Sequence, residues 1–235
     1  MSETFYLSKI LFSWKKITGE DWVRYTQHDF VKGLSDGSLP KSSFKKYLIQ
    51  DYIFLTHFTR AWALAVVKSE TIDEMKLAAS TVNALINYEM QLHIDTCKKI
   101  GISEEELFES EEAIENLSYT RFVMDSGFSG DFVDLMAALS PCIFGYGEIG
   151  KNLSRLSVPN NPYRNWIDAY SGDEYQNLCN SLGQLIESST LKRIGPVPGE
   201  NPRWRTLCKR FHVATKLEIN FWTMGLRATN ENQNF

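Results

Sequence analysis

Along most of this sequence, apolar residues recur at intervals of three and four, which places them on one face of an α-helix. Alternating runs rich in Val, Ile and Thr, which indicate strands, are missing. The pattern therefore predicts an all-α protein. We expect helices over residues 3–17, 20–34, 40–68, 71–100, 111–126, 130–156, 162–170, 173–189 and 201–228, with a short helical turn at 103–106.

Signals for helix ends support these limits and give no sign of a second domain. Ser38 and Pro40 form a cap-then-proline start for the helix over 40–68. Gly101 ends the helix over 71–100. The longest expected loop, LKRIGPVPGENP at 191–202, has helical flanks of similar composition. No internal repeat occurs, so we predict one helical bundle, a single domain covering residues 1–235.

The composition is that of a soluble globular protein, with 43% apolar and 23% charged residues. No uninterrupted run of apolar residues has the length of a membrane span. A net charge of −4 with interspersed signs gives no basic stripe for nucleic acid. The start MSETFYLSKILFSWKK lacks the features of a secretory leader, so we expect a cytoplasmic protein. The cysteines form no CxxC pair, which favours reduced thiols over a zinc site or disulfides: Cys97, Cys142, Cys179 and Cys208.

The helix expected over 40–68 carries an acid in the middle of its apolar face. Asp51 shares that face with Phe44, Leu48, Leu55, Phe58 and Trp62. A carboxylate there loses water, so it needs a partner or takes a raised pKa, and both conditions are common in active sites. Asp51 fits a structural hydrogen bond to a neighbouring helix equally well.

The last expected helix repeats this arrangement. Glu218 shares a face with Phe211, Phe221 and Trp222. Two inward carboxyl groups on separate helices can supply a general acid and a general base, because burial raises one pKa while hydrogen bonds lower the other. They also fit a purely structural network.

The segment ALSPCIFGYGEIG places Cys142 one helical turn from Tyr146 on an apolar face. A lone cysteine on such a face is more often an inert core residue than a nucleophile. Here, however, a proline and three glycines interrupt the helical pattern, which indicates a kink or a close backbone contact: Pro141, Gly145, Gly147 and Gly150.

Other side chains are weaker candidates for a pocket or a metal site than Asp51, Glu218 and Cys142. Tyr119, Trp166 and Tyr170 combine aromatic surface with a polar tip, which suits a flat ring and also suits an ordinary core. Glu89 and His93 lie one turn apart, but the other histidines do not complete the Glu-x-x-His arrangement of a di-iron bundle. We therefore expect no metal and interpret Glu89 and His93 as making a hydrogen bond between helices.

These segments resemble the TenA or thiaminase II family over nearly the whole chain. The matching pieces are YLIQDYIFL around Asp51, LSYTRFV around Tyr119, SPCIFGYGEIG around Cys142, WIDAYSG around Tyr170 and KLEINFW around Glu218. Their order and spacing together are specific, whereas each alone is weak. The resemblance implies a bundle like that of haem oxygenase without haem or any other cofactor, usually assembled as a homotetramer.

The resemblance also implies an enzyme of thiamin salvage, which hydrolyses 4-amino-5-aminomethyl-2-methylpyrimidine with release of ammonia, or cleaves thiamin to hydroxymethylpyrimidine and thiazole. Cys142 would be the nucleophile of the Cys-containing branch, and Glu218 would be the acid or base. Asp51 would hold the amino edge of the pyrimidine. The remaining matched positions would pack around or bond to the substrate: Phe54, Tyr119, Tyr146 and Tyr170.

Two other functions stay open at this point. One is a pyrroloquinoline-quinone synthase-like or di-iron oxidase of the same superfamily, which Cys142 beside Tyr146 disfavours. The other is a non-catalytic, pyrimidine-binding regulatory protein, which the combination of Cys142 and Glu218 disfavours.

Overall fold

The computed structural model describes residues 5–231 of the chain, with side chains to residue 227, and confirms the all-α prediction. Within that range the only extended pairing is an isolated bridge between Phe5 and Ser8. A π-helical turn, η1 (Leu85–Glu89), and a 3-10 turn, η2 (Pro198–Glu200), accompany the α-helices. These are α1 (Lys9–Thr18), α2 (Glu20–Thr26), α3 (Asp29–Asp36), α4 (Lys41–Lys68), α5 (Ile72–Ala84), α6 (Met90–Lys99), α7 (Glu104–Glu109), α8 (Ile114–Ser129), α9 (Phe132–Leu156), α10 (Arg164–Ser171), α11 (Asp173–Ile194) and α12 (Pro202–Glu231).

The prediction of a helix starting at residue 3 is wrong within the described part, and residues 3 and 4 lie outside it. Tyr6 and Leu7 have φ angles of 45° and 57°, which no α-helix accommodates. The helix starts only at Lys9, where the Ser8 hydroxyl accepts a hydrogen bond from the Leu11 amide at 3.1 Å.

The helix predicted over 20–34 is in fact two helices, α2 and α3. The break falls at His28, whose Nδ1 accepts a hydrogen bond from the Phe30 amide and so caps α3. Histidine is not a usual capping residue, which is why the apolar periodicity concealed the break. Gly37, in the left-handed region with a φ of 76°, ends α3.

The other predicted helices are present with shifted ends. The helix expected over 71–100 contains the π-helical turn η1 between α5 and α6. The first residues of the expected 191–202 loop are helical, because α11 continues to Ile194 and stops at Gly195, where φ is 90°.

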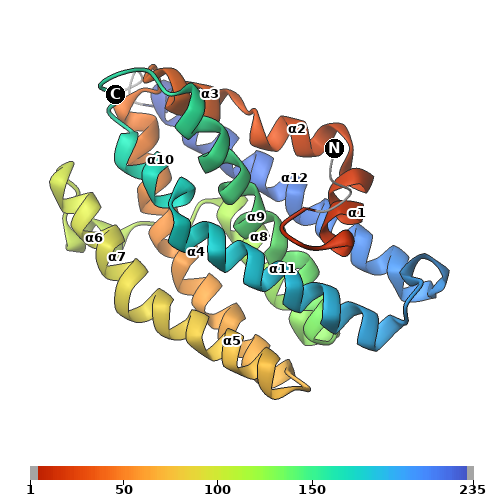
Figure 1. Cartoon of the computed structure of the whole chain (residues 1–235). Coiled ribbons are helices and arrows are strands. Elements are labelled where there is room, and N and C mark those ends of the chain that lie inside the picture. Colours follow the sequence, from red (N-terminus) through yellow and green to blue (C-terminus); the bar gives the residue numbers. More distant parts are fainter. Residues whose placement is uncertain (1–4, 232–235) are drawn as a thin grey trace.

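Helix α9 lies at the centre of the molecule, packed against α12, α10, α8 and α11. Figure 1 shows α1–α3 along the upper edge of the molecule and α5–α7 along its lower left edge. In the described part, α9 alone is long and apolar enough to cross a membrane, but 89% of that stretch is buried inside the fold. Its apolar character is therefore that of a core helix.

The two apolar stripes that carry acids face the interior, as predicted. Asp51 is 7% exposed on α4 and Glu218 is 2% exposed on α12, and the apolar residues beside each are buried. Helices α4 and α12 contact each other directly, and both contact α9.

Candidate functional site

A narrow cavity of about 50 Å³ lies between α4, α5, η1, α9, α10 and α11. Five residues predicted from the sequence line it: Asp51, Phe54, Cys142, Tyr146 and Tyr170. The other two, Tyr119 and Glu218, are buried outside the lining and contact each other. The remaining lining is mostly apolar and comprises Leu55, Phe58, Trp62, Thr81, Leu85, Glu89, Ile143, Tyr175, Leu178 and Leu182.

Asp51 is surrounded by neutral polar partners. The Tyr47 hydroxyl lies 3.4 Å from Asp51 Oδ2, and His93 Nδ1 lies 3.5 Å from the same oxygen. Burial raises the pKa of Asp51 to about 7, against a smaller lowering by the hydrogen bond from Tyr47. Asp51 therefore exchanges a proton near neutral pH.

The His93 contact is best described as neutral, although its length is that of an ion pair. His93 Nε2 lies 2.8 Å from the Leu48 carbonyl, which only accepts, so Nε2 carries the hydrogen. Burial lowers the pKa of His93, which leaves Nδ1 as an acceptor facing Asp51. A protonated Asp51 matches that acceptor.

Glu218 contacts Cys142 from within the core. The Tyr119 hydroxyl donates to Glu218 Oε1 at 2.8 Å. Burial raises the pKa of Glu218 to about 8, although hydrogen bonds from Tyr119, Tyr25 and Cys142 lower it. Burial, and then the charge of Glu218, raise the pKa of the Cys142 thiol well above its usual range. The thiol and the carboxyl group are thus adjacent acids, of which Glu218 loses its proton first.

Small residues in α9 let aromatic rings reach the helix backbone around Cys142. A Cβ atom on Gly145 would lie 2.0 Å from Tyr25 Cε1, and the Tyr25 hydroxyl donates to the Pro141 carbonyl at 3.2 Å. A Cβ atom on Gly150 would lie 2.5 Å from the carbonyl carbon of Tyr170. The close backbone contacts expected for this segment are confirmed, and they position α10 with its Tyr170.

Aromatic rings form one wall of the cavity and also orient Asp51. The Tyr146 and Tyr170 rings have centroids 4.9 Å apart, and Trp166 lies 4.6 Å from Tyr170. Trp166 Nε1 donates to the Tyr47 hydroxyl at 3.2 Å, and Tyr47 in turn donates to Asp51. Sequence reasoning missed Tyr47, which shares the buried face of α4 one turn before Asp51.

Glu89 is the second acid that lines the cavity, beside Asp51. The sequence singled out Glu89 and His93 together, and His93 makes the expected bond to another helix, whereas the Glu89 side chain makes no hydrogen bond to the described residues. The described part of the chain holds no group of three side chains suited to a metal ion.

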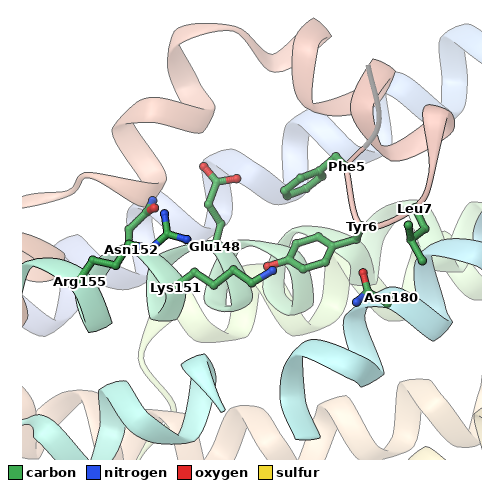
Figure 2. A pocket seen from close by; sticks show the side chains of 8 residues that line it. All are labelled: Phe5, Tyr6, Leu7, Glu148, Lys151, Asn152, Arg155 and Asn180. Atoms are coloured by element: carbon green, nitrogen blue, oxygen red, sulfur yellow. The ribbon is translucent and has the colours of Figure 1, made fainter. Parts of the chain in front are cut away.

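A second, larger hollow of about 290 Å³ lies at the surface beside the N-terminal segment (Figure 2). Lys151 lies with its Nζ 4.9 Å from the centre of the Tyr6 ring, and the Tyr6 hydroxyl donates to Gln176. None of the residues predicted as a site lines this hollow. Cys142, Asp51 and Glu89 line the smaller cavity, so we place the candidate site there.

The fold and cavity define a helical protein in which a thiol and two acids line an aromatic-walled cavity, with a third acid, Glu218, in contact with the thiol. The model of the TENA/THI-4/PQQC family matches residues 17–228, and the chain belongs to this family.

Relatives and solved structures give the same family. The chain is 34% identical over 215 residues to an aminopyrimidine aminohydrolase of Halalkalibacterium halodurans, covering 91% of this chain and 93% of the relative. It is 30% identical over 217 residues to the aminopyrimidine aminohydrolase of Bacillus subtilis, covering 91% of this chain and 88% of the relative. A TenA family transcription regulator from Silicibacter sp. TM1040 superposes with a TM-score of 0.92 at 51% identity, covering 96% of this chain and 99% of that one.

Proposed function

We propose that this protein is a thiamin-salvage hydrolase that converts 4-amino-5-aminomethyl-2-methylpyrimidine to the hydroxymethylpyrimidine with release of ammonia, and also cleaves thiamin. One observation carries the proposal: Cys142 and Asp51 line the same cavity, and Glu218 contacts the Cys142 thiol. Relatives named aminopyrimidine aminohydrolase, at 29–34% identity, support it.

Covalent addition overcomes the difficulty of substituting an amine at this position. The Cys142 thiolate adds to the pyrimidine ring while a ring nitrogen takes a proton, and the amine then leaves the exocyclic methylene as ammonia. Water adds to the methylene carbon and loses one proton. Cys142 then departs as the thiolate and the ring nitrogen releases the proton that it took, which restores the aromatic ring. The net reaction consumes one water and exchanges the amine for a hydroxyl group.

Glu218 is the group that we assign to proton transfer with Cys142. Because the pKa of Cys142 lies above that of Glu218, the thiol keeps its proton when no positive charge is near. A protonated pyrimidine beside the thiol lowers the thiol's pKa, so we expect substrate binding to promote the transfer.

Asp51 and the rings supply orientation. Asp51 faces the cavity from α4, and its carboxyl group suits the amino edge of a pyrimidine. Phe54 and Tyr146 provide apolar faces for a flat ring. Holding the ring in this way brings its attacked carbon to the thiol, a contribution of proximity.

The test is to incubate the protein separately with the aminomethylpyrimidine and with thiamin, and to follow hydroxymethylpyrimidine, ammonia and thiazole. We expect turnover of at least one compound, and the two kcat/KM values rank them. Tight binding with no product from either compound would favour the regulatory, pyrimidine-binding alternative, and the solved structure called a transcription regulator gives that alternative a specific basis.

We further propose that the chain acts in the cytoplasm as a homotetramer. Tyr88 and Leu92, one turn apart, are 70% and 61% exposed, and Phe108 is 69% exposed. Exposed large apolar side chains of this kind are typical of subunit interfaces. Light scattering should give four times the chain mass of 27.0 kDa, and a monomer at micromolar concentration would contradict the proposal.

A further inference from the structure

The π-helical turn η1 brings Thr81, Glu89 and His93 to the same side of their helical run. The step from Thr81 to His93 turns a straight α-helix through about 1,200°, which leaves these two residues about 120° apart. A π-helical turn holds an extra residue and takes back about 100°. Thr81 and Glu89 accordingly both line the cavity, and His93 faces Asp51 on the same side.

The Glu89 carboxyl group differs from the other two acids of the site, because no side chain of the described residues bonds to it. Asp51 has Tyr47 and His93, and Glu218 has Tyr119, whereas the Glu89 carboxyl group makes no hydrogen bond or ion pair to the described residues. The titratable groups that interact with the Glu89 charge include the acid Asp51 and the phenols Tyr170 and Tyr175. Burial, and then the charge of Asp51, raise the pKa of Glu89 to about 7. A carboxyl group in this setting gains a strong interaction only when a cation enters the cavity.

We propose that Glu89 binds the positively charged leaving group of the substrate, and that it favours a primary ammonium over a thiazolium. The proposal rests on the proposed function, because Asp51 is assigned to the amino edge and Cys142 to the ring. Glu89 and Cys142 line one narrow cavity from different helices, so a ring held by Asp51 beside Cys142 leaves its exocyclic cation to Glu89. An ammonium donates hydrogen bonds to a carboxylate, and a thiazolium nitrogen has none to donate.

The first test compares Glu89→Gln with the wild type on both substrates. We expect kcat/KM for the aminomethylpyrimidine to fall about tenfold to a hundredfold, the scale of a lost hydrogen bond to a charged group, and kcat/KM for thiamin to fall much less. Asp95→Asn is the matched control, because Asp95 is exposed on α6, the helix that continues from η1, and faces solvent. An equal fall for both substrates, or no fall for either, overturns the proposal.

A binding measurement tests the role of Glu89 independently of turnover. Calorimetry with the aminomethylpyrimidine and with the neutral hydroxymethylpyrimidine should show that the wild type prefers the ammonium compound and that Glu89→Gln loses this preference. Equal preference in both proteins overturns the assignment of Glu89 even if the enzyme is active. A wild type that binds with this preference but forms no product overturns the proposed function and leaves the assignment of Glu89 standing.

Discussion

At the scale of single residues, the site depends on carboxyl groups that hold protons near neutral pH. Burial raises the pKa of Asp51 and Glu89 to about 7 and that of Glu218 to about 8. Ordinary surface acids are fully ionised at these values. The three groups therefore exchange protons in the range where the proposed reaction needs them, and Cys142 lies next to Glu218 with a thiol that ionises only with help.

Replacing Glu218 by Gln should lower turnover by roughly two orders of magnitude or more, because the amide cannot exchange a proton with Cys142. The Gln oxygen still accepts the Tyr119 hydrogen bond, so the fold should persist. Steady-state kinetics and circular dichroism check both points, with Glu105→Gln on the exposed face of α7 as the control. Near-normal turnover in Glu218→Gln would exclude the assigned role.

Cys142 should react with iodoacetamide faster than the other thiols. It lines the cavity and is only partly buried, whereas Cys97, Cys179 and Cys208 are buried in the core. Because burial raises the pKa of all four, access should determine the order at neutral pH. Peptide mass mapping with and without a pyrimidine measures the order and the protection by ligand.

The serine variant of Cys142 tests whether the thiol is needed as the nucleophile of the reaction. Cys142→Ser should lose most turnover, because a hydroxyl group is a much weaker nucleophile at neutral pH. If Cys142 labels no faster than the rest and the serine variant stays fully active, covalent catalysis does not occur here.

At the scale of elements, two irregularities place the chemistry. Gly145 and Gly150 let the Tyr25 ring and the α10 backbone approach α9, and the Tyr25 hydroxyl donates to the Pro141 carbonyl. The π-helical turn η1 ends at Glu89, which lines the cavity. Both features weaken regular helix, and both lie beside the candidate site, where π-helical turns are often found.

Gly145→Ala should destabilise the protein by about 1–3 kcal/mol, because the added methyl group overlaps the Tyr25 ring and forces one of them to move. The Tyr25 hydrogen bond to Pro141 should be disturbed as well, with a loss of activity. Urea unfolding measures the change. Gly199→Ala is the control, since a Cβ atom there meets open space, and equal stability of the two variants would show that the contact is looser than described.

At the scale of the whole molecule, the buried acids couple stability to pH. The folded-state pKa of Asp51 and Glu218 lies above the usual values of 3.8 and 4.5. The folded protein therefore binds more protons than the unfolded chain between those values and pH 7 to 8. Their favourable contribution is complete below the unfolded pKa and is lost as pH rises through the folded pKa.

The free energy of unfolding should accordingly fall between about pH 4 and pH 8 less steeply in Asp51→Asn than in the wild type, since one of these acids is gone. Denaturant unfolding at several pH values measures the difference. Parallel curves for the two proteins would mean that Asp51 is ionised throughout, held by a partner stronger than Tyr47 or His93.

The sequence by itself determined the helical class and the inward direction of Asp51 and Glu218, because a three-and-four spacing of apolar residues is a local property that survives folding. It also determined the family, from segments whose order and spacing the family model and relatives confirm. The single-domain prediction for residues 1–235 stays a prediction, since the structure describes residues 5–231.

Only the tertiary structure decided which of these residues share a cavity and what their neighbours do to their protons. Helical periodicity places a side chain on a face, but the packing of α4, η1 and α9 brings Asp51, Glu89 and Cys142 together across long sequence separations. The left-handed Tyr6 and Leu7, the His28 cap and the π-helical turn were hidden for the same reason. Each of these irregular features costs local conformational energy. Contacts with distant parts of the chain offset that cost, and the local sequence pattern does not show such contacts.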